Sequence, residues 1–327
     1  MTLRAILTAV FCLAFAQPAL AEPANISADV AVLKQSSDTQ ALINSCRHLI
    51  PAMFVTTPYL TKATSSPNGE TALTALKTFI LTGHNAAAQI RCARDLGSAS
   101  HVQVADPPTR SMTYSPYADH ANEAILAMFN DPNPAIRVGA ANAMWGVSVA
   151  ADGRALLRHA DSDPDPAVVA ASFQNLYWGM KADVDASHDE IAYDTVIARG
   201  LNSSNVNVIA AALTGYGGLH SIAADKTLRR YALDKRAAVR LGAIAAYDSL
   251  MVYNKSITDF LETRLSDPNI DVRDRVMLEL MRMGDEHALP AIDKLARTAP
   301  TADERSSAAG YAKTIREDAA NNARLSH

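Results

Sequence analysis

Two pairs of side chains have the residue types and spacing for acid–base chemistry. His120 lies three residues before Glu123, and His188 lies next to Asp189. A histidine beside a carboxylate can accept and return a proton near neutral pH, as general acid–base catalysis requires. A hydrogen-bonded helix start explains the first pair more simply, and an exposed turn explains the second. We therefore prefer structural roles for both pairs and keep an enzyme site, or an accessory subunit of an enzyme, as the alternative.

An acidic stretch, residues 183–190, has oxygen-bearing side chains at the spacing of a calcium-binding loop. In an EF-hand frame the ligand places 1, 3, 5, 7 and 12 hold Asp183, Asp185, Ser187, Asp189 and Asp194. However, the sixth place is a histidine where the loop needs glycine, and the twelfth is a short Asp where a bidentate Glu is usual. We therefore predict an exposed acidic loop that caps a helix starting at Ile191, and no bound metal.

The sequence contains none of the common catalytic or nucleotide-binding motifs. There is no H-E-x-x-H, G-x-x-x-x-G-K-[ST], G-x-S-x-G or C-x-x-C. The glycine-rich segment 215–218 ends a predicted helix instead of opening one after a strand, so it is a poor phosphate cradle and is better explained as a helix stop. The sequence therefore predicts no cofactor.

Residues 1–21 are typical of a secretory signal peptide. Arg4 provides the positive start, an apolar run follows over residues 5–16, and an A-x-A site predicts cleavage after Ala21. The run is too short to span a membrane comfortably, and no later stretch has 18 uncharged apolar residues. We expect a periplasmic or secreted protein without a membrane span in the mature chain.

Two of the three cysteines remain after removal of that segment. In an oxidising compartment Cys46 and Cys92 are expected to form a disulfide that stabilises the fold by about 3–4 kcal/mol. A redox-active pair is the alternative, but the cysteines lack the C-x-x-C spacing.

One pattern recurs along the chain from about residue 119. A polar turn, often Asp-Pro-Asn, leads into an aliphatic residue and then into a helix rich in small residues. The aligned aliphatic residues are Ile136, Val168, Val208, Val239 and Val272, at intervals of 32, 40, 31 and 33. A period of this length indicates stacked helix pairs. The 40-residue unit contains the acidic stretch as an insertion.

This pattern resembles HEAT repeats of the short type that is also found in phycobilisome lyases. The resemblance covers about 119–316 and implies a right-handed α-solenoid that binds proteins or peptides, without the motifs for lyase chemistry. It also implies that the recurring arginines, Arg137, Arg240 and Arg273, bridge to an acidic residue of a neighbouring turn; anion binding is the alternative. Val169 and Ile209 replace two of these arginines, and the unit at residues 301–315 is degenerate.

The elements that carry these groups are all expected to be helices. The first helix of each pair is predicted over residues 121–130, 153–159, 190–201, 223–233, 257–265 and 288–296. An N-terminal cap, residues 22–118, is predicted to hold helices over 41–54, 71–81 and 86–96, a polar loop over 61–69 and a long connection over 98–119. The polar tail after residue 315 is expected to fray, and residues 119–327 form the predicted solenoid region.

Aromatic residues make up only 6% of the chain, so their places in the repeats are informative. Trp145 and Tyr177 occupy the same repeat place, Tyr216 and Tyr247 lie one place earlier, and Trp178 lies one place later. Core packing is the simpler explanation, and the alternative is a row at one rim that anchors a partner. With Asp183, Asp185 and Asp189, these residues are our candidate partner contacts.

Composition limits the class of function. Hydrophobic residues make up 49% of the chain, and 34 acidic against 30 basic residues give a net charge of −4. This balance argues against general nucleic-acid binding, which needs a concentrated basic face. The sequence favours an all-α, non-enzymatic scaffold for a protein or peptide, of which an immunity-type or assembly-type factor would be one version.

Overall fold

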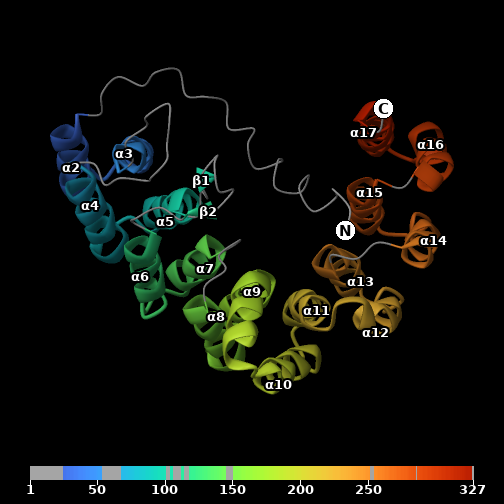
Figure 1. Cartoon of the computed structure of the whole chain (residues 1–327), viewed down its shortest axis with the longest axis horizontal. Coiled ribbons are helices and arrows are strands. Elements are labelled where there is room, and N and C mark those ends of the chain that lie inside the picture. Colours follow the sequence, from blue (N-terminus) through green and yellow to red (C-terminus); the bar gives the residue numbers. More distant parts are fainter. Residues whose placement is uncertain are drawn as a thin grey trace.

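Helices in two layers follow one arc in the computed structural model (Figure 1). The structure describes residues 25–53, 68–100, 104–105, 112–113, 118–144, 150–250, 254–284 and 286–325. The predicted signal peptide and Trp145 lie outside these ranges. Each inner helix packs on the next inner helix, so the architecture is an all-α solenoid.

The inner layer contains the second helix of each pair. Its helices are α3 (Thr39–Ala52), α5 (Ala86–Ser100), α7 (Pro134–Ala143), α9 (Pro166–Ser187), α11 (Val206–His220), α13 (Ala237–Ala245), α15 (Ile270–Met283) and α17 (Ala302–Leu325). The 3-10 turn η4 (Ala246–Leu250) follows α13 directly.

The outer layer contains the first helix of each pair. Its helices are α2 (Ile26–Gln35), α4 (Gly69–Thr82), α6 (Ala118–Met128), α8 (Ala150–Ser162), α10 (Glu190–Leu201), α12 (Asp225–Tyr231), α14 (Lys255–Arg264) and α16 (Leu289–Thr298). Short 3-10 turns, η3 (Ser221–Ala224) and η5 (Glu286–Ala288), precede α12 and α16. No helix within the described ranges is both long and apolar enough to cross a membrane.

The polar turns start the inner helices as their composition predicts. A side-chain oxygen before each of four helices accepts a hydrogen bond from a first-turn amide at 2.8–3.1 Å; the capping residues are Asn133, Asp165, Asn205 and Asn269. Proline at the first position of α7 and α9 loses no helical hydrogen bond. The aligned aliphatic residues that follow are all buried in the core.

Arginines at one repeat position tie neighbouring units together, as the resemblance implies. Each reaches the next unit's turn or helix start with an Nη2–carboxylate distance of 2.9, 2.8 and 2.8 Å; the pairs are Arg137–Asp163, Arg240–Asp267 and Arg273–Glu304. The acidic partners are buried, and each arginine also donates to a carbonyl of its own turn. We call these three pairs the arginine ladder.

The arginine ladder is interrupted in two middle units, and its last arginine has no following unit to bridge to among the described residues. Val169 and Ile209 stand at its places in two consecutive middle units, so no arginine can bridge from there. Arg305 takes the same place in the last unit and donates from Nη1 to the carbonyls of Ala299 and Pro300. The unit that looked degenerate in sequence therefore keeps the arginine and its turn.

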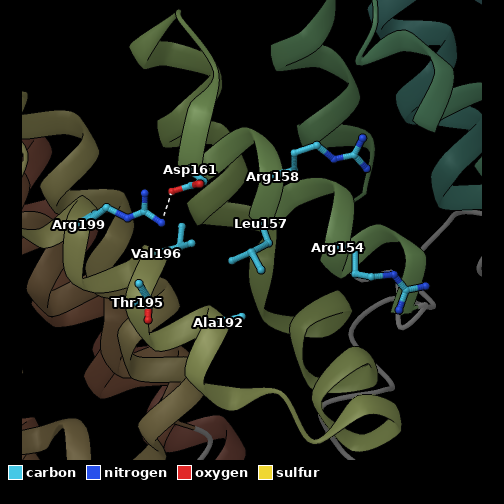
Figure 2. Close-up of a pocket in the computed structure, with 8 residues that line it drawn as sticks. All are labelled: Arg154, Leu157, Arg158, Asp161, Ala192, Thr195, Val196 and Arg199. Carbon is cyan, nitrogen blue, oxygen red and sulfur yellow. Dashed lines mark ion pairs between the residues drawn. The ribbon is translucent and has the colours of Figure 1, made fainter.

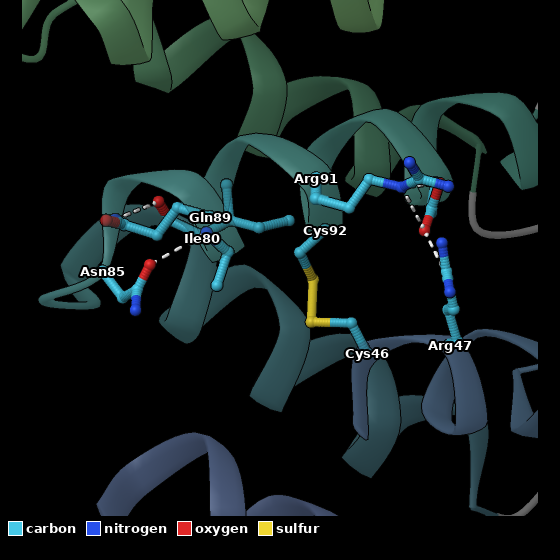
Figure 3. The surroundings of a disulfide bond; sticks show 9 residues. Cys46, Arg47, Ile80, Asn85, Gln89, Arg91 and Cys92 are labelled. Atoms are coloured by element: carbon cyan, nitrogen blue, oxygen red, sulfur yellow. Dashed lines mark hydrogen bonds and ion pairs between the residues drawn. A yellow bond between two sulfur atoms is a disulfide. The ribbon is translucent and has the colours of Figure 1, made fainter. Parts of the chain in front are cut away.

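The predicted disulfide is confirmed and joins two inner helices of the N-terminal cap. Cys46 on α3 bonds to Cys92 on α5 with a Cα–Cα distance of 5.7 Å, and both residues are fully buried (Figure 3). Beside it, Asp95 forms ion pairs with Arg47 of α3 and Arg91 of α5 at 3.2 and 3.0 Å. The covalent bond and the ion pairs hold the same two helices together.

Three predictions of irregular structure were wrong. Residues 183–187 are the last turns of α9 and not a loop, so most of the inserted residues of the long unit lengthen a helix. The polar tail is helical, because α17 continues to Leu325. The long connection contains two short antiparallel strands, β1 (Val104–Ala105) and β2 (Met112–Thr113), with Val104 opposite Thr113. The helix α2 was not predicted at all.

Candidate partner-binding groove

A groove of about 290 Å³ lies where the C-terminal halves of α9 and α11 meet η4. Its side chains come from three successive helix pairs, and it includes the predicted residues Tyr177 and Asp185. We call it the aromatic groove. Its lining residues are Tyr177, Met180, Lys181, Val184, Asp185, Glu190, Gly218, Leu219, Ser221, Ser249 and Leu250.

Close helix packing forms the floor of the aromatic groove. A Cβ atom on Gly218 would lie 2.5 Å from the Cδ2 of Tyr177, so only glycine lets this ring lie against α11. A Cβ on Gly217 would lie 2.8 Å from the carbonyl oxygen of Ala246, where η4 approaches. These glycines lie inside α11, which ends only at His220. The prediction that they stop the helix was therefore wrong, and their role is close approach.

Tyr177 is the predicted aromatic residue that lines the groove, and Trp178 packs against it without lining the groove. Their rings meet edge to face with centroids 4.8 Å apart, and both side chains are half-buried. Burial raises the pKa of the Tyr177 hydroxyl, so this ring stays neutral at physiological pH. Tyr177 therefore offers the groove a neutral, largely apolar surface, and Trp178 supports its ring.

Tyr216 and Tyr247, the other predicted aromatic residues in the described part of the chain, do not continue this surface as one row. Tyr216 is half-buried, packs on His220 with ring centroids 4.3 Å apart, and its hydroxyl lies 3.2 Å from the Thr227 hydroxyl. Tyr247 is fully buried and donates a hydrogen bond to Asp225 at 2.9 Å. Tyr247 is therefore a core residue, out of reach of a partner.

The three predicted acidic contacts have different surroundings. Asp183 is buried, where it accepts a hydrogen bond from the Tyr193 hydroxyl at 2.9 Å and forms an ion pair with Arg154. Asp185 lies two residues further along α9 and is exposed in the aromatic groove. Asp189 is exposed and caps α10. Only Asp185 of these three lines the groove, and Asp183 has a structural role.

The two acid–base pairs lie apart, and neither lines the aromatic groove. His120 Nδ1 lies 3.4 Å from Glu123 Oε2 on the exposed start of α6. Hydrogen bonds from His120 and Lys77 lower the pKa of Glu123, which is opposite to the shift that a general acid needs. His188 is exposed at the left-handed cap of α9, with φ of 57°. The geometry therefore favours the structural interpretation of both pairs.

The part of the chain that the structure describes contains no cluster of three or more His, Cys, Asp or Glu side chains that could hold an ion. The calcium-loop frame fails for a physical reason, because a helix directs alternate side chains such as Asp183 and Asp185 to different faces.

Several residues of the groove were not singled out from the sequence. Lys181 lies one helical turn after Tyr177 and therefore shares its face of α9. Leu219 and Leu250 come from the next two units, so only the stacking of three units brings them beside Lys181. Gly218, which lies one unit after Tyr177, was the sequence signal for the close contact between α11 and the Tyr177 ring.

The chain matches no protein-family model and no curated protein. Among solved structures it is similar to YibA of Escherichia coli, with 18% identity over 77% of this chain and 88% of that one, at a TM-score of 0.43. It is also similar to two engineered proteins. One has 14% identity over 89% of this chain and 78% of that chain, with a TM-score of 0.32. The other has 16% identity over 89% and 96%, with a TM-score of 0.25.

Proposed function

We propose that the chain is a periplasmic or secreted, non-enzymatic scaffold that binds a protein or peptide in the aromatic groove. The observation that carries this proposal is the combination of apolar surface and charge at one place. Tyr177, Val184 and Leu219 provide the apolar part, and charged side chains surround it. Recognition sites in proteins commonly combine an apolar centre with a few placed polar groups.

The groove is supported by packed helices, which reduces the cost of binding. Most of its residues lie on α9, α11 and η4, with Glu190 on α10 and Ser221 in η3, and the Tyr177 ring is fixed by its contact with Gly218. A surface that is already ordered loses little conformational entropy when a partner docks. This is the property that a scaffold needs.

The charges at the rim favour a partner with a basic residue. Asp185 and Glu190 outnumber Lys181, so the rim has an excess of negative charge. A partner segment with an apolar side chain next to lysine or arginine would complement both parts of the groove.

The proposed compartment rests on two observations. The disulfide between Cys46 and Cys92 is typical of proteins in oxidising compartments, and residues 1–21 have the pattern of a cleaved signal. Expression of the full chain in a bacterium should yield a periplasmic product whose measured mass corresponds to a chain that starts at Glu22. A cytoplasmic product that keeps Met1 and has reduced cysteines would refute this part.

A peptide selection tests the binding proposal. Residues 22–327 are used to select from a random peptide library, and the recovered peptides are measured by fluorescence anisotropy. We expect peptides with an apolar residue beside a basic one, whose affinity falls about tenfold with Asp185→Lys, because a favourable charge contact becomes repulsive.

The matched control is Asp318→Lys, which makes the same charge change on an exposed position of α17. The affinity should change less than about twofold with this control, because charges far outside the groove are screened. Recovered peptides that bind the Asp185→Lys variant as well as the native chain would refute the aromatic groove as the binding site.

A further inference from the structure

A second groove, of about 330 Å³, lies on the outer layer between α8 and α10 (Figure 2). Three arginines and one carboxylate line it, in a chain whose net charge is −4. We call it the arginine groove. Its residues of interest are Arg154, Arg158, Arg199, Asp161, Leu157 and Val196.

The arginines stand on two sides of an apolar floor. Figure 2 shows Leu157 of α8 and Val196 of α10 in the middle, with Arg199 on one side and Arg154 and Arg158 on the other. The positive charge is therefore divided between two rims. A ligand that uses both rims needs two separated anionic groups and an apolar part between them.

The guanidinium groups keep N–H donors that are available to a ligand. Arg199 binds Asp161 at 2.6 Å, and Arg154 binds the buried Asp183, yet both arginine side chains are about 60% exposed, at 61% and 58%. Arg158 is exposed and makes no ion pair with the part of the chain that the structure describes. Each guanidinium has five N–H donors, so one ion pair leaves several of them for a ligand.

A ligand could break the Arg199–Asp161 ion pair, which crosses the groove, at a small cost in free energy. The Arg199–Asp161 contact is exposed, and exposed ion pairs contribute little stability. A ligand carboxylate can therefore replace Asp161 at Arg199. Arg154 is different, because its partner is buried in the fold and the pair must stay intact.

We propose that the arginine groove binds an acidic peptide segment, in which two carboxylates flank an apolar side chain. The carboxylates lie against Arg158 and Arg199, since planar guanidinium and carboxylate groups can form paired hydrogen bonds. The apolar side chain covers Leu157 and Val196. An isolated phosphate could contact the arginines of only one rim, and it would leave Leu157 and Val196 uncovered.

This site is separate from the aromatic groove in place and in charge. The aromatic groove is formed mainly by α9, α11 and η4, with Glu190 at the start of α10, and has a negative rim; the arginine groove is formed by α8 and a later part of α10, shares no lining residue with it and is positive. The scaffold would therefore select two partner segments of opposite charge.

A labelled peptide tests the inference. The sequence Glu-Glu-Leu-Leu-Glu-Glu, with blocked ends, is titrated with residues 22–327 at low salt, and binding is followed by fluorescence anisotropy. Arg158→Gln should weaken binding about fivefold or more, because it removes a charge that lies on one rim. The variant keeps the fold, since Arg158 is exposed and forms no ion pair with the described part of the chain.

Matched controls separate this site from general charge attraction. Arg297→Gln removes the same charge at an exposed position of α16 and should change the affinity less than about twofold. Asp185→Lys, in the aromatic groove, should not weaken binding. A peptide with Gln at every Glu should not bind, and one with Gly at both Leu should bind more weakly.

Three results would overturn the inference. The first is an equal loss of affinity for Arg158→Gln and Arg297→Gln, which would mean that net charge alone attracts the peptide. The second is binding of inorganic phosphate, but not of the peptide, with sensitivity to Arg158→Gln. The third is binding of vesicles that contain an anionic lipid, with no binding of the peptide.

Discussion

Replacing Arg137 by glutamine should destabilise the fold by about 3 kcal/mol at pH 7, the lower end of the cost of breaking a buried ion pair. Arg137 donates two hydrogen bonds of 2.9 Å to Asp163, whose carboxylate is 2% exposed. The variant leaves this buried charge with only His159 and the Asp165 amide, each at 2.9 Å.

The pKa of Asp163 indicates how this penalty depends on pH. Burial alone would raise this pKa, but hydrogen bonds from Arg137, the Asp165 amide and His159 outweigh burial and lower it from 3.8 to about 2. A difference of this size between the folded and unfolded chain corresponds to about 2 kcal/mol for burial and the three donors together, and Arg137 is one of these donors. A lowered folded-state pKa stabilises the protein above the unfolded value, and this stabilisation is lost as pH falls from about 4 to below 2.

Urea unfolding followed by circular dichroism measures both effects. We expect a lower midpoint for Arg137→Gln at pH 7, and a difference from the native chain that shrinks between pH 4 and pH 2. The control is Arg158→Gln, which removes an exposed arginine from the neighbouring helix α8 and should change stability by less than about 0.5 kcal/mol. A penalty below about 1 kcal/mol at pH 7, or one that does not depend on pH, would refute this account of the arginine ladder.

Three further predictions concern the disulfide, a helix contact and a buried acid. Replacing both Cys46 and Cys92 by alanine should lower the free energy of unfolding by about 3–4 kcal/mol, measured by urea titration; an unchanged midpoint would refute a stabilising bond. Gly218→Ala should cost about 1–3 kcal/mol and alter tryptophan fluorescence, because the new Cβ would lie 2.5 Å from a tyrosine ring carbon. Gly310→Ala, whose new Cβ would have no neighbouring atom within 4 Å, should instead leave stability unchanged or raise it. Equal losses of stability at the two positions would contradict the packing argument. Burial raises the pKa of Glu279 from 4.5 to about 7, so the charged form costs stability as pH rises from about 4.5 to above 7. Glu279→Gln should therefore be more stable than the native chain at pH 8, by at most about 3 kcal/mol, and gain nothing at pH 4; a gain at both values would exclude titration as its cause.

The repeating pattern was sufficient to predict the helix pairs, because caps and buried aliphatic residues recur at fixed places. The outer helix at residues 190–201 begins and ends as predicted. The end of α9 was missed because alternating acidic residues look like a loop in sequence. Val184, one turn after Met180, instead continues the packed side of the helix.

The candidate site was only partly predictable, because equal repeat places do not have equal surroundings. Tyr216 and Tyr247 share a place, yet only Tyr247 is fully buried. The hydroxyls of both tyrosines meet α12, at Thr227 and Asp225 respectively, so the shared repeat place gives the same hydroxyl environment but not the same burial. Both grooves depend on contacts between units, and such contacts are not visible in the pattern of a single unit.

The gap in the arginine ladder has a mechanical consequence for the arc. Buried pairs link neighbouring units on both sides of the gap, whereas Val169 and Ile209 provide no such link in the middle units. Some of the polar links there are exposed, such as Arg199–Asp161, and these weaken as salt rises. Exposed pairs add little stability, so the middle units are joined mainly by the packing of α9 on α11 and by the buried hydrogen bond from Tyr193 to Asp183, which salt screens much less. Both grooves lie on these middle units, so we expect their shape to change little with ionic strength.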